Sequence, residues 1–290
     1  MLRIMTDAAA DIPAATAKEL NIEILPFMIH LGDKTICADR DFTPEEYYDL
    51  LRQTDEIPTT CQMSPADVES VYRRLGADGD SIIHVTISSN GSGIYNTSCL
   101  VAEQLNEEGF DITVVDSRMF AYVIGYPVVT AAQMAAEGKS KEEILTFLHM
   151  CYTRDTAYFV VDDLTFLKKG GRIKATTMAI STMLDIKPIL NINGGLVEAY
   201  RKVRGLKKAM SVLVQYAQER MESPEKNTVY ILHSDAEDKV EILSKMVEEK
   251  VKPAEIKVMK IGPIITSHAG LGLVGIYFPH QKPYTDYENK

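Results

Sequence analysis

Short apolar segments alternate with helical segments over the first half of the chain. Four apolar segments predict β-strands, at residues 2–5, 22–30, 81–87 and 111–116. Between them, Thr43-Pro44-Glu45-Glu46 forms a capping box with proline at the first helical position, and Ser64-Pro65 begins a second helix. Because strands that alternate with helices form parallel sheets covered on both faces, we expect an α/β domain here.

The pattern changes after residues 120–153, which predict two helices separated by Gly138. A strand over 157–163, a short helix ended by a Gly-Gly pair, and a hairpin turn at Asn193-Gly194-Gly195 follow. Two further strands flank a helix over 235–250. Hairpins combined with helices predict an α+β domain with a mixed or antiparallel sheet. We therefore divide the chain into an N-terminal α/β domain (1–153) and a C-terminal α+β domain (154–290).

Composition agrees with two globular domains, since 46% of the 290 residues are hydrophobic and 25% are charged. The longest apolar segments, such as LGLVGIYF, are shorter than the roughly 20 residues that a membrane span needs. Acidic residues near the N-terminus argue against a signal peptide. Four widely spaced cysteines without a C-x-x-C motif argue against a zinc site or a disulfide framework. We expect a cytoplasmic protein with reduced thiols and no bound metal.

Charge is unevenly distributed along the chain. The net charge of -10 disfavours binding to nucleic acid or to anionic membranes. The segment 168–208 nevertheless carries +8, which leaves -18 for the remainder. Its two acidic residues are Asp185 and Glu198, and its ten basic residues are Lys168, Lys169, Arg172, Lys174, Lys187, Arg201, Lys202, Arg204, Lys207 and Lys208. Such a segment is either a solvated face or a docking surface for an anionic partner.

The segment TISSNGSGIYNTS (86–98) joins a predicted strand to a predicted helix. This arrangement places Gly91, Ser92 and Gly93 at the helix N-terminus, where unpaired backbone N–H groups and the helix dipole favour an anion. The glycines allow a ligand to approach the backbone closely, and Ser92 adds a hydroxyl donor. Alternatively, Ser92 only caps its own helix.

Three other polar side chains are also suited to binding an anion. Thr60 lies in a predicted loop before the second helix, Arg172 follows the Gly-Gly turn, and His268 lies in a predicted glycine-rich loop. A guanidinium binds a carboxylate or phosphate through paired hydrogen bonds. A lone histidine is more often a packing group than a functional one. Together with Ser92, these residues suit binding an oxyanion better than breaking a bond.

Catalytic motifs are incomplete in this sequence. Ser92, Asp116 and His268 follow the chain order of an α/β-hydrolase triad, but Asn90 and Ile94 stand where the nucleophile elbow needs glycine. The G-x-G-x-x-G match at 270–275 ends too close to the C-terminus for a dinucleotide fold. No phosphate-binding loop is present for a phosphotransferase. A stand-alone serine hydrolase therefore stays a minor alternative.

Seven segments, in order, resemble the DegV family, the fatty-acid-binding subunits of bacterial fatty acid kinase. Four are close to the family's T-D-S-x-x-D-L-P, T-T-S-Q-P-S, S-S-x-L-S-G-T-Y and H-x-G-P-G patterns, and three match K-G-G-R-I, I-K-P-I-L and K-V-R. In this chain they read TDAAADIP (6–13), TTCQMS (59–64), SSNGSGIY (88–95), HAGLG (268–272), KKGGRI (168–173), IKPIL (186–190) and KVR (202–204). The resemblance covers nearly the whole chain.

The resemblance implies one long-chain fatty acid bound between and within two domains. The implied contacts to its carboxylate come from Thr60, Ser92 and His268, with Gly93 in the same turn and Arg172 nearby. A separate ATP-dependent kinase subunit then phosphorylates this carboxylate to an acyl phosphate. On this basis we expect a binding subunit that is not itself an enzyme, has no cofactor beyond the bound lipid, and contacts membranes at most transiently.

The acyl chain needs an apolar tunnel. The segments 119–127 and 175–184 are candidates for its wall, and the predicted lining residues are Ile94, Phe120, Met178 and Met183. An ordinary packed helix explains the second segment equally well. Gly91 replaces a leucine and Ile94 a threonine of the family pattern, Cys61 and Met63 depart from it beside Thr60, and Leu271 replaces a proline beside His268. These departures predict a shifted acyl preference and less rigid loops. The main alternative ligand is a different carboxylated lipid, such as a bile acid, retinoid or branched lipid, which would share the headgroup site and differ in the tunnel.

Overall fold

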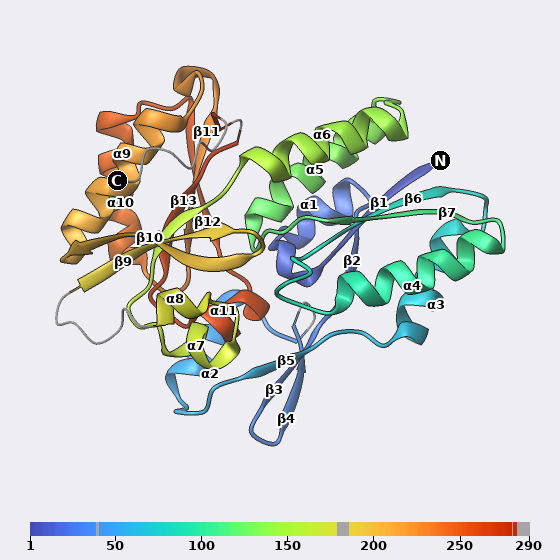
Figure 1. Ribbon diagram of the computed structural model, residues 1–290, viewed down its shortest axis with the longest axis horizontal. Coiled ribbons are helices and arrows are strands. Elements are labelled where there is room, and N and C mark those ends of the chain that lie inside the picture. Colours follow the sequence, from blue (N-terminus) through green and yellow to red (C-terminus); the bar gives the residue numbers. More distant parts are fainter. Residues whose placement is uncertain (39–40, 179–185, 280, 283–290) are drawn as a thin grey trace.

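The computed structural model describes residues 1–38, 41–178, 186–279 and 281–282 (Figure 1). Its N-terminal half contains a sheet with strand order β2-β1-β6-β7, in which every pair is parallel. The strands are β1 (Leu2–Asp7), β2 (Glu23–Leu25), β6 (Ser81–Thr86) and β7 (Asp111–Asp116). The α/β sheet predicted for this half is therefore confirmed.

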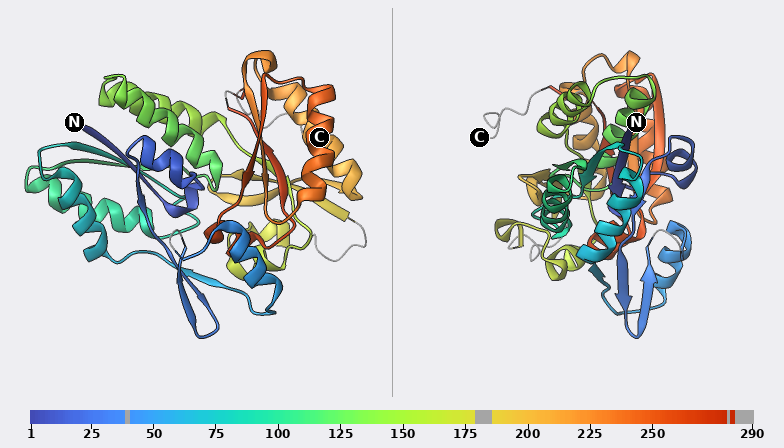
Figure 2. Two further views of the ribbon diagram at one scale, coloured as in Figure 1. Left: turned by 180° about the vertical axis from the view of Figure 1, so that it is seen from behind. Right: turned by 90° about the vertical axis from the view of Figure 1, so that its right-hand side faces the viewer.

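Helices cover both faces of this sheet, with α3 and α4 on one side and α5 and α6 on the other (Figures 1 and 2). Three helices of this half, α2, α3 and α6, begin with capping boxes at Thr43, Ser64 and Ser140, where side chains satisfy otherwise unpaired backbone N–H groups. The helices of this half are α1 (Ala14–Glu19), α2 (Pro44–Arg52), α3 (Pro65–Gly76), α4 (Ile94–Glu107), α5 (Tyr122–Ala136) and α6 (Lys141–Arg154). The predicted domain boundary falls at the end of α6.

The C-terminal half contains a six-stranded sheet with order β10-β9-β8-β13-β11-β12. Only the pair β11–β12 is parallel, so the sheet is mixed, as predicted. Its strands are β8 (Tyr158–Val160), β9 (Ile186–Asn193), β10 (Leu196–Arg204), β11 (Thr228–His233), β12 (Glu255–Lys260) and β13 (Val274–Tyr277). Its helices are α7 (Thr165–Gly170), α8 (Ala175–Met178), α9 (Leu206–Arg220), α10 (Glu237–Lys250) and α11 (Pro263–Ala269).

A third, antiparallel sheet was not predicted. It has the order β4-β3-β5 and consists of β3 (Met28–Leu31), β4 (Lys34–Cys37) and β5 (Thr59–Cys61). The single strand predicted over 22–30 is wrong, because Pro26 has no N–H to donate to a ladder and the chain passes there from β2 in one sheet to β3 in another. Thr60, expected in a loop, lies on β5, where it pairs with Ile29.

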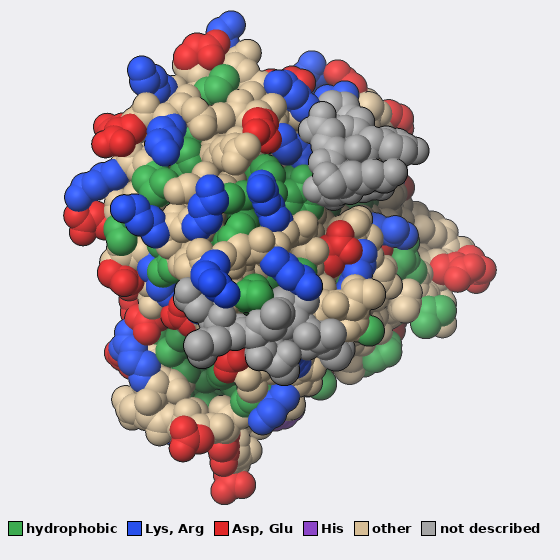
Figure 3. Space-filling model, turned by 60° about the vertical axis from the view of Figure 1, so that its left-hand side comes forward, with side chains coloured by type: hydrophobic (Ala, Val, Ile, Leu, Met, Phe, Trp, Pro, Cys, Tyr) green, Lys and Arg blue, Asp and Glu red, His purple; other side chains and the backbone are tan. Residues whose placement is uncertain are grey.

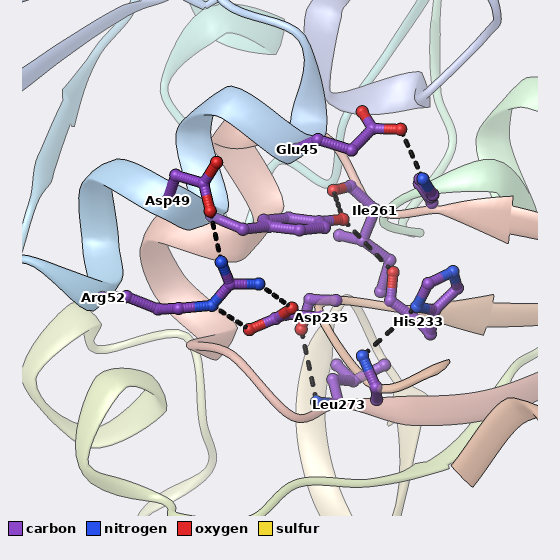
Figure 4. A network of polar contacts seen from close by, with 11 residues as sticks. Glu45, Asp49, Arg52, His233, Asp235, Ile261 and Leu273 are labelled. Atoms are coloured by element: carbon purple, nitrogen blue, oxygen red, sulfur yellow. Dashed lines mark hydrogen bonds and ion pairs between the residues drawn. The ribbon is translucent and has the colours of Figure 1, made fainter. Parts of the chain in front are cut away.

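Helix α2 belongs to the N-terminal half but packs on the C-terminal half (Figure 4). The Tyr48 hydroxyl donates to the Ile261 carbonyl at 2.5 Å. Arg52 donates through Nε to Asp235 at 2.8 Å, and its side chain also contacts Asp49. Helix α2 therefore connects the N-terminal half to the residues that follow β11 and β12, which helps to fix the two halves relative to each other.

Tyr48→Phe tests this connection. Tyr48 is only 2% exposed, and removing its hydroxyl leaves the buried Ile261 carbonyl with the longer bond from Thr266, at 3.2 Å, so the free energy of unfolding should fall by about 1 kcal/mol. Urea unfolding followed by circular dichroism measures this loss. Tyr122→Phe is the control, because the Tyr122 hydroxyl makes no hydrogen bond to a described residue. Equal losses in the two variants would contradict the role given to the Tyr48 bond.

Candidate binding site

A cavity lies between the two halves, with about 810 Å³ of space not occupied by atoms, its open end included. Both halves contribute to its wall. Apart from Gly91, the apolar lining residues are Phe27, Ile87, Phe120, Ala121, Ala157, Phe159, Leu167, Ile192, Val197, Leu232, Ile261, Ile264, Ile265, Ala269 and Leu273. Among the described residues, the polar side chains that line it are those of Thr60, Ser92, Arg172 and His268. The four side chains selected from the sequence are thus brought together in one cavity.

Acidic side chains at strand ends shape the turn that carries Ser92. Asp7 accepts the backbone N–H of Ile87 at 2.7 Å, and Asp116 accepts both the backbone N–H and the hydroxyl of Ser89, at 3.0 and 2.6 Å. Burial raises the pKa of Asp7 to about 7. These contacts hold the turn in place before any ligand binds, and they give Asp7 and Asp116 structural roles.

Ser92 precedes the N-terminus of α4 and is not its cap residue. The N-cap is Gly93, and the Ser92 hydroxyl oxygen accepts only a long hydrogen bond, 3.4 Å, from the Ile94 N–H. Because this contact is weak, the hydroxyl keeps its donor for a partner in the cavity. The simple capping role considered from the sequence therefore accounts for little of its position.

His268 lies in the last turn of α11, so its assignment to a glycine-rich loop was wrong. Pro263 at the first helical position starts this short helix, and Gly270 ends it. The ring Nε2 lies 2.8 Å from the Thr60 hydroxyl oxygen. Burial, and secondarily the charge of Arg172, lowers the pKa of His268 to about 4, so the ring is neutral at physiological pH.

The tautomer of the neutral ring decides what this pair offers to a ligand. A neutral imidazole has one N–H, and with the proton on Nε2 it donates to Thr60. The Thr60 hydroxyl then directs its own proton to another acceptor. The other ring nitrogen, Nδ1, is buried against Gly170, where a Cβ would lie 2.7 Å away, and it has no partner among the described residues.

Arg172 supplies positive charge at the same place. Its Nε donates to the Gly91 carbonyl at 2.9 Å, and its Nη1 donates to the Gly170 carbonyl. Burial lowers the pKa of Arg172, yet a guanidinium stays charged at neutral pH. The side chain is half-buried, so its charge acts on the cavity with less screening than at an exposed surface.

The residues predicted to line the acyl tunnel do not all lie at the cavity. Phe120 lines the cavity, and its ring covers Gly91 so closely that a Cβ there would lie 2.5 Å from Cε1. The apolar group lost where Gly91 replaces leucine is thus supplied by Phe120. Gly93 and Ile94 are not among the lining residues, and Ile94 is fully buried. Met178 is the last residue of α8, and Met183 lies outside the described residues.

Most of the apolar wall was not predicted. It comes from strands, from α11 and from the β6–α4 and β7–α5 connections, for example Leu232 on β11 and Ile264 on α11. Apolar residues at such positions have the same pattern whether they pack in a core or face a cavity. The sequence therefore contained no signal that separates these two roles.

The geometry does not assemble a hydrolase triad. The imidazole of His268 contacts Thr60, while the carboxylate of Asp116 is used by Ser89 and the Arg118 backbone. Within the described ranges, no group of three His, Cys, Asp or Glu side chains is placed to hold a metal ion. Among the helices that the structure describes, none is long and apolar enough to cross a membrane.

These features define a two-part α/β protein with an internal, mainly apolar cavity and a polar cluster. The chain belongs to the DegV family: a family model described as "Uncharacterised protein, DegV family" matches residues 1–280. A DegV domain-containing protein of Clostridium perfringens is 35% identical over 280 residues, which is 95% of this chain and 96% of the relative.

Solved structures of DegV family proteins have the same fold. A DegV family protein from Thermus thermophilus, described by its fatty acid binding, has a TM-score of 0.85 at 30% identity, covering 96% of this chain and 99% of its own. A fatty-acid-binding DegV family protein from Streptococcus agalactiae has a TM-score of 0.87 at 27% identity, covering 98% and 99%. Both of these family members are thus described as fatty-acid-binding proteins.

Proposed function

We propose that this protein binds one long-chain fatty acid in the cavity between its halves, with the carboxylate at Thr60, Ser92, Arg172 and His268. The observation that carries the proposal is the composition of the cavity wall. Within the part of the chain that the structure describes, its polar side chains are these four and the remaining wall is apolar. His268 contacts Thr60 at 2.8 Å, and Arg172 donates to the carbonyl of Gly91, next to Ser92. An anionic head with a long apolar chain matches this distribution.

Energetics favour a long chain. Each buried CH₂ contributes about 0.8 kcal/mol, so a sixteen-carbon chain gains on the order of 10 kcal/mol before ordering costs. The carboxylate would receive hydrogen bonds from the two hydroxyls and from the guanidinium, which replace part of its lost hydration. A neutral His268 supports this arrangement by orienting the Thr60 hydroxyl.

We further propose that a separate ATP-dependent kinase subunit phosphorylates the bound carboxylate to an acyl phosphate, and that this chain presents the lipid without catalysing the transfer. The resemblance to the binding subunits of fatty acid kinase supports this step. So does the exposed group Arg201, Lys202, Lys207 and Lys208, here called the basic surface, on β10 and the start of α9. Figure 3 shows Lys and Arg side chains across the middle of one face of the molecule.

Native mass spectrometry of freshly purified protein tests the lipid proposal. We expect one fatty acid per chain, because a cavity with a mainly apolar wall buries the acyl chain and retains it through purification. A different carboxylated lipid in the spectrum would favour the alternative ligand class. Empty protein that also fails to bind a fluorescent fatty acid at micromolar concentration would overturn the proposal.

Two matched variants locate the lipid. Leu232→Trp fills the cavity with an indole and should abolish co-purification. Leu100→Trp makes the same change at a side chain on α4 that is 64% exposed, and should retain the lipid. Circular dichroism establishes that both variants fold. Retention of lipid by a folded Leu232→Trp protein would place the ligand elsewhere.

A further inference from the structure

Helix α11, which carries His268, is held along its length by residues of the N-terminal half. At its start, Asp11 lies against Gly262, where a Cβ would come within 2.6 Å of the Asp11 Oδ1 atom. Gly262 has φ −71° and ψ 173°, an extended backbone open to any residue, so the missing side chain matters for this close approach. At its end, His268 meets Thr60 on β5.

Between these two contacts, Tyr47 of α2 reaches Ser267. The two hydroxyl oxygens are 2.5 Å apart, and both side chains are at most 1% exposed. Because the Ser267 hydroxyl donates to the Pro263 carbonyl at 2.7 Å, the shared proton comes from Tyr47. The bond therefore has a defined direction, from the N-terminal half to the residue that immediately precedes His268.

The bond fixes the rotation of α11 about its axis. A seven-residue helix has few internal hydrogen bonds and depends on tertiary contacts for its orientation. Neighbouring residues of a helix point about 100° apart, so a rotation that moves Ser267 from Tyr47 also moves His268 from Thr60. The 2.8 Å contact between His268 and Thr60 is sensitive to such a rotation, because hydrogen bonds weaken steeply with distance and angle.

We propose that Tyr47 is a positioning residue of the carboxylate site: through Ser267 it sets α11 so that His268 orients the Thr60 hydroxyl toward the ligand. This inference rests on the proposed fatty-acid function. It also makes carboxylate recognition depend on the fit between the two halves, because Tyr47 and Thr60 belong to one half and α11 to the other. Tyr47 is not among the residues that line the cavity.

Tyr47→Phe tests the proposal, since it removes the hydroxyl and keeps the ring. The readout is the ratio of affinities for hexadecanoic acid and hexadecan-1-ol, measured by competition with a fluorescent fatty acid. The two ligands share an alkyl chain, so the ratio reports carboxylate recognition alone. We expect the acid/alcohol ratio to fall by on the order of three- to tenfold, the effect of one weakened hydrogen bond.

Three further variants separate positioning from general destabilisation. Ser267→Ala should lower the ratio to the same extent, and the double variant Tyr47→Phe/Ser267→Ala should show no additional loss, because both changes break one link. Tyr72→Phe removes a buried hydroxyl of α3 that lies 2.7 Å from the Nδ1 atom of His84, within the N-terminal half. It should lower stability and leave the ratio unchanged.

The ring nitrogens of His268 give a second measurement. In ¹⁵N-labelled lipid-bound protein, the wild-type spectrum should show one neutral tautomer with the proton on Nε2, and Tyr47→Phe should shift these signals toward a tautomer average. An unchanged acid/alcohol ratio with unchanged His268 signals in a folded Tyr47→Phe protein would overturn the inference. An equal fall in Tyr72→Phe would also overturn it. A wild-type protein with no preference for the acid would instead reject the proposed carboxylate site.

Discussion

Ser92→Ala should reduce phosphorylation of the bound fatty acid by a partner kinase by on the order of 100-fold, because a carboxylate displaced by about 1 Å reacts far more slowly. Ser92 lines the cavity. Among the described residues, its hydroxyl makes one long hydrogen bond, accepted from the Ile94 N–H at 3.4 Å. Its loss should cost about 1–3 kcal/mol of lipid binding, against a contribution on the order of 10 kcal/mol from a sixteen-carbon chain. The lipid should therefore stay bound while its carboxylate loses its orientation.

The measurement pairs a kinase assay with lipid quantification in the same protein sample. His268→Ala should behave in the same way, since Thr60 then loses its orienting partner. Ser64→Ala is the control, because it removes a helix cap of α3 in the same half and makes no contact with the cavity. Loss of lipid binding in a folded Ser92→Ala or His268→Ala protein would contradict the view that the acyl chain supplies most of the binding energy while the headgroup contacts orient the carboxylate.

Elements with local signals were predictable from the sequence. The capping box at Thr43 and the Ser64-Pro65 pair marked helix starts, and Gly194-Gly195 marked the turn between β9 and β10. The strand-turn-helix unit around Ser92 also appeared as expected, because glycines and hydroxyl residues have distinct preferences at helix N-termini. These features depend on residues that are close together in the chain.

Features that depend on long-range packing were not predictable. Tyr47 and Tyr48 have the pattern of ordinary core residues of α2, and nothing local shows that they face the C-terminal half. The polar side chains of the cavity stood out because they lie beside glycine turns or a helix start and within segments that resemble family motifs. The residues of its apolar wall did not stand out, since the sequence pattern around Leu232 or Ile264 is the same as that of ordinary core residues.

Reversing the charge of the basic surface should slow phosphorylation at low salt and leave lipid affinity unchanged. The variant replaces Arg201, Lys202, Lys207 and Lys208 by Glu, which changes the local charge by eight units. All four side chains are exposed, and none lines the cavity. Unlike Lys174, which is paired with Glu198 at 2.6 Å, none of the four forms an ion pair with a described residue.

The expected effect is kinetic. A group of like charges attracts an oppositely charged partner over distance and raises the rate of encounter, by a factor of about 10 or more at low ionic strength. Mobile ions screen exposed charges over about 10 Å at 0.1 M salt, so the wild-type rate should fall as salt rises. The reversed variant should be slow at low salt and less sensitive to added salt.

A kinase assay at two ionic strengths, with protein well below saturation, measures this difference. The control variant reverses four exposed lysines on other elements, Lys18, Lys34, Lys245 and Lys250, and therefore has the same net charge without altering the basic surface. It should retain most of the wild-type rate at low salt. If the wild-type rate does not depend on salt and equals that of the reversed variant, the basic surface is only a solvated face, and the kinase docks elsewhere on the molecule.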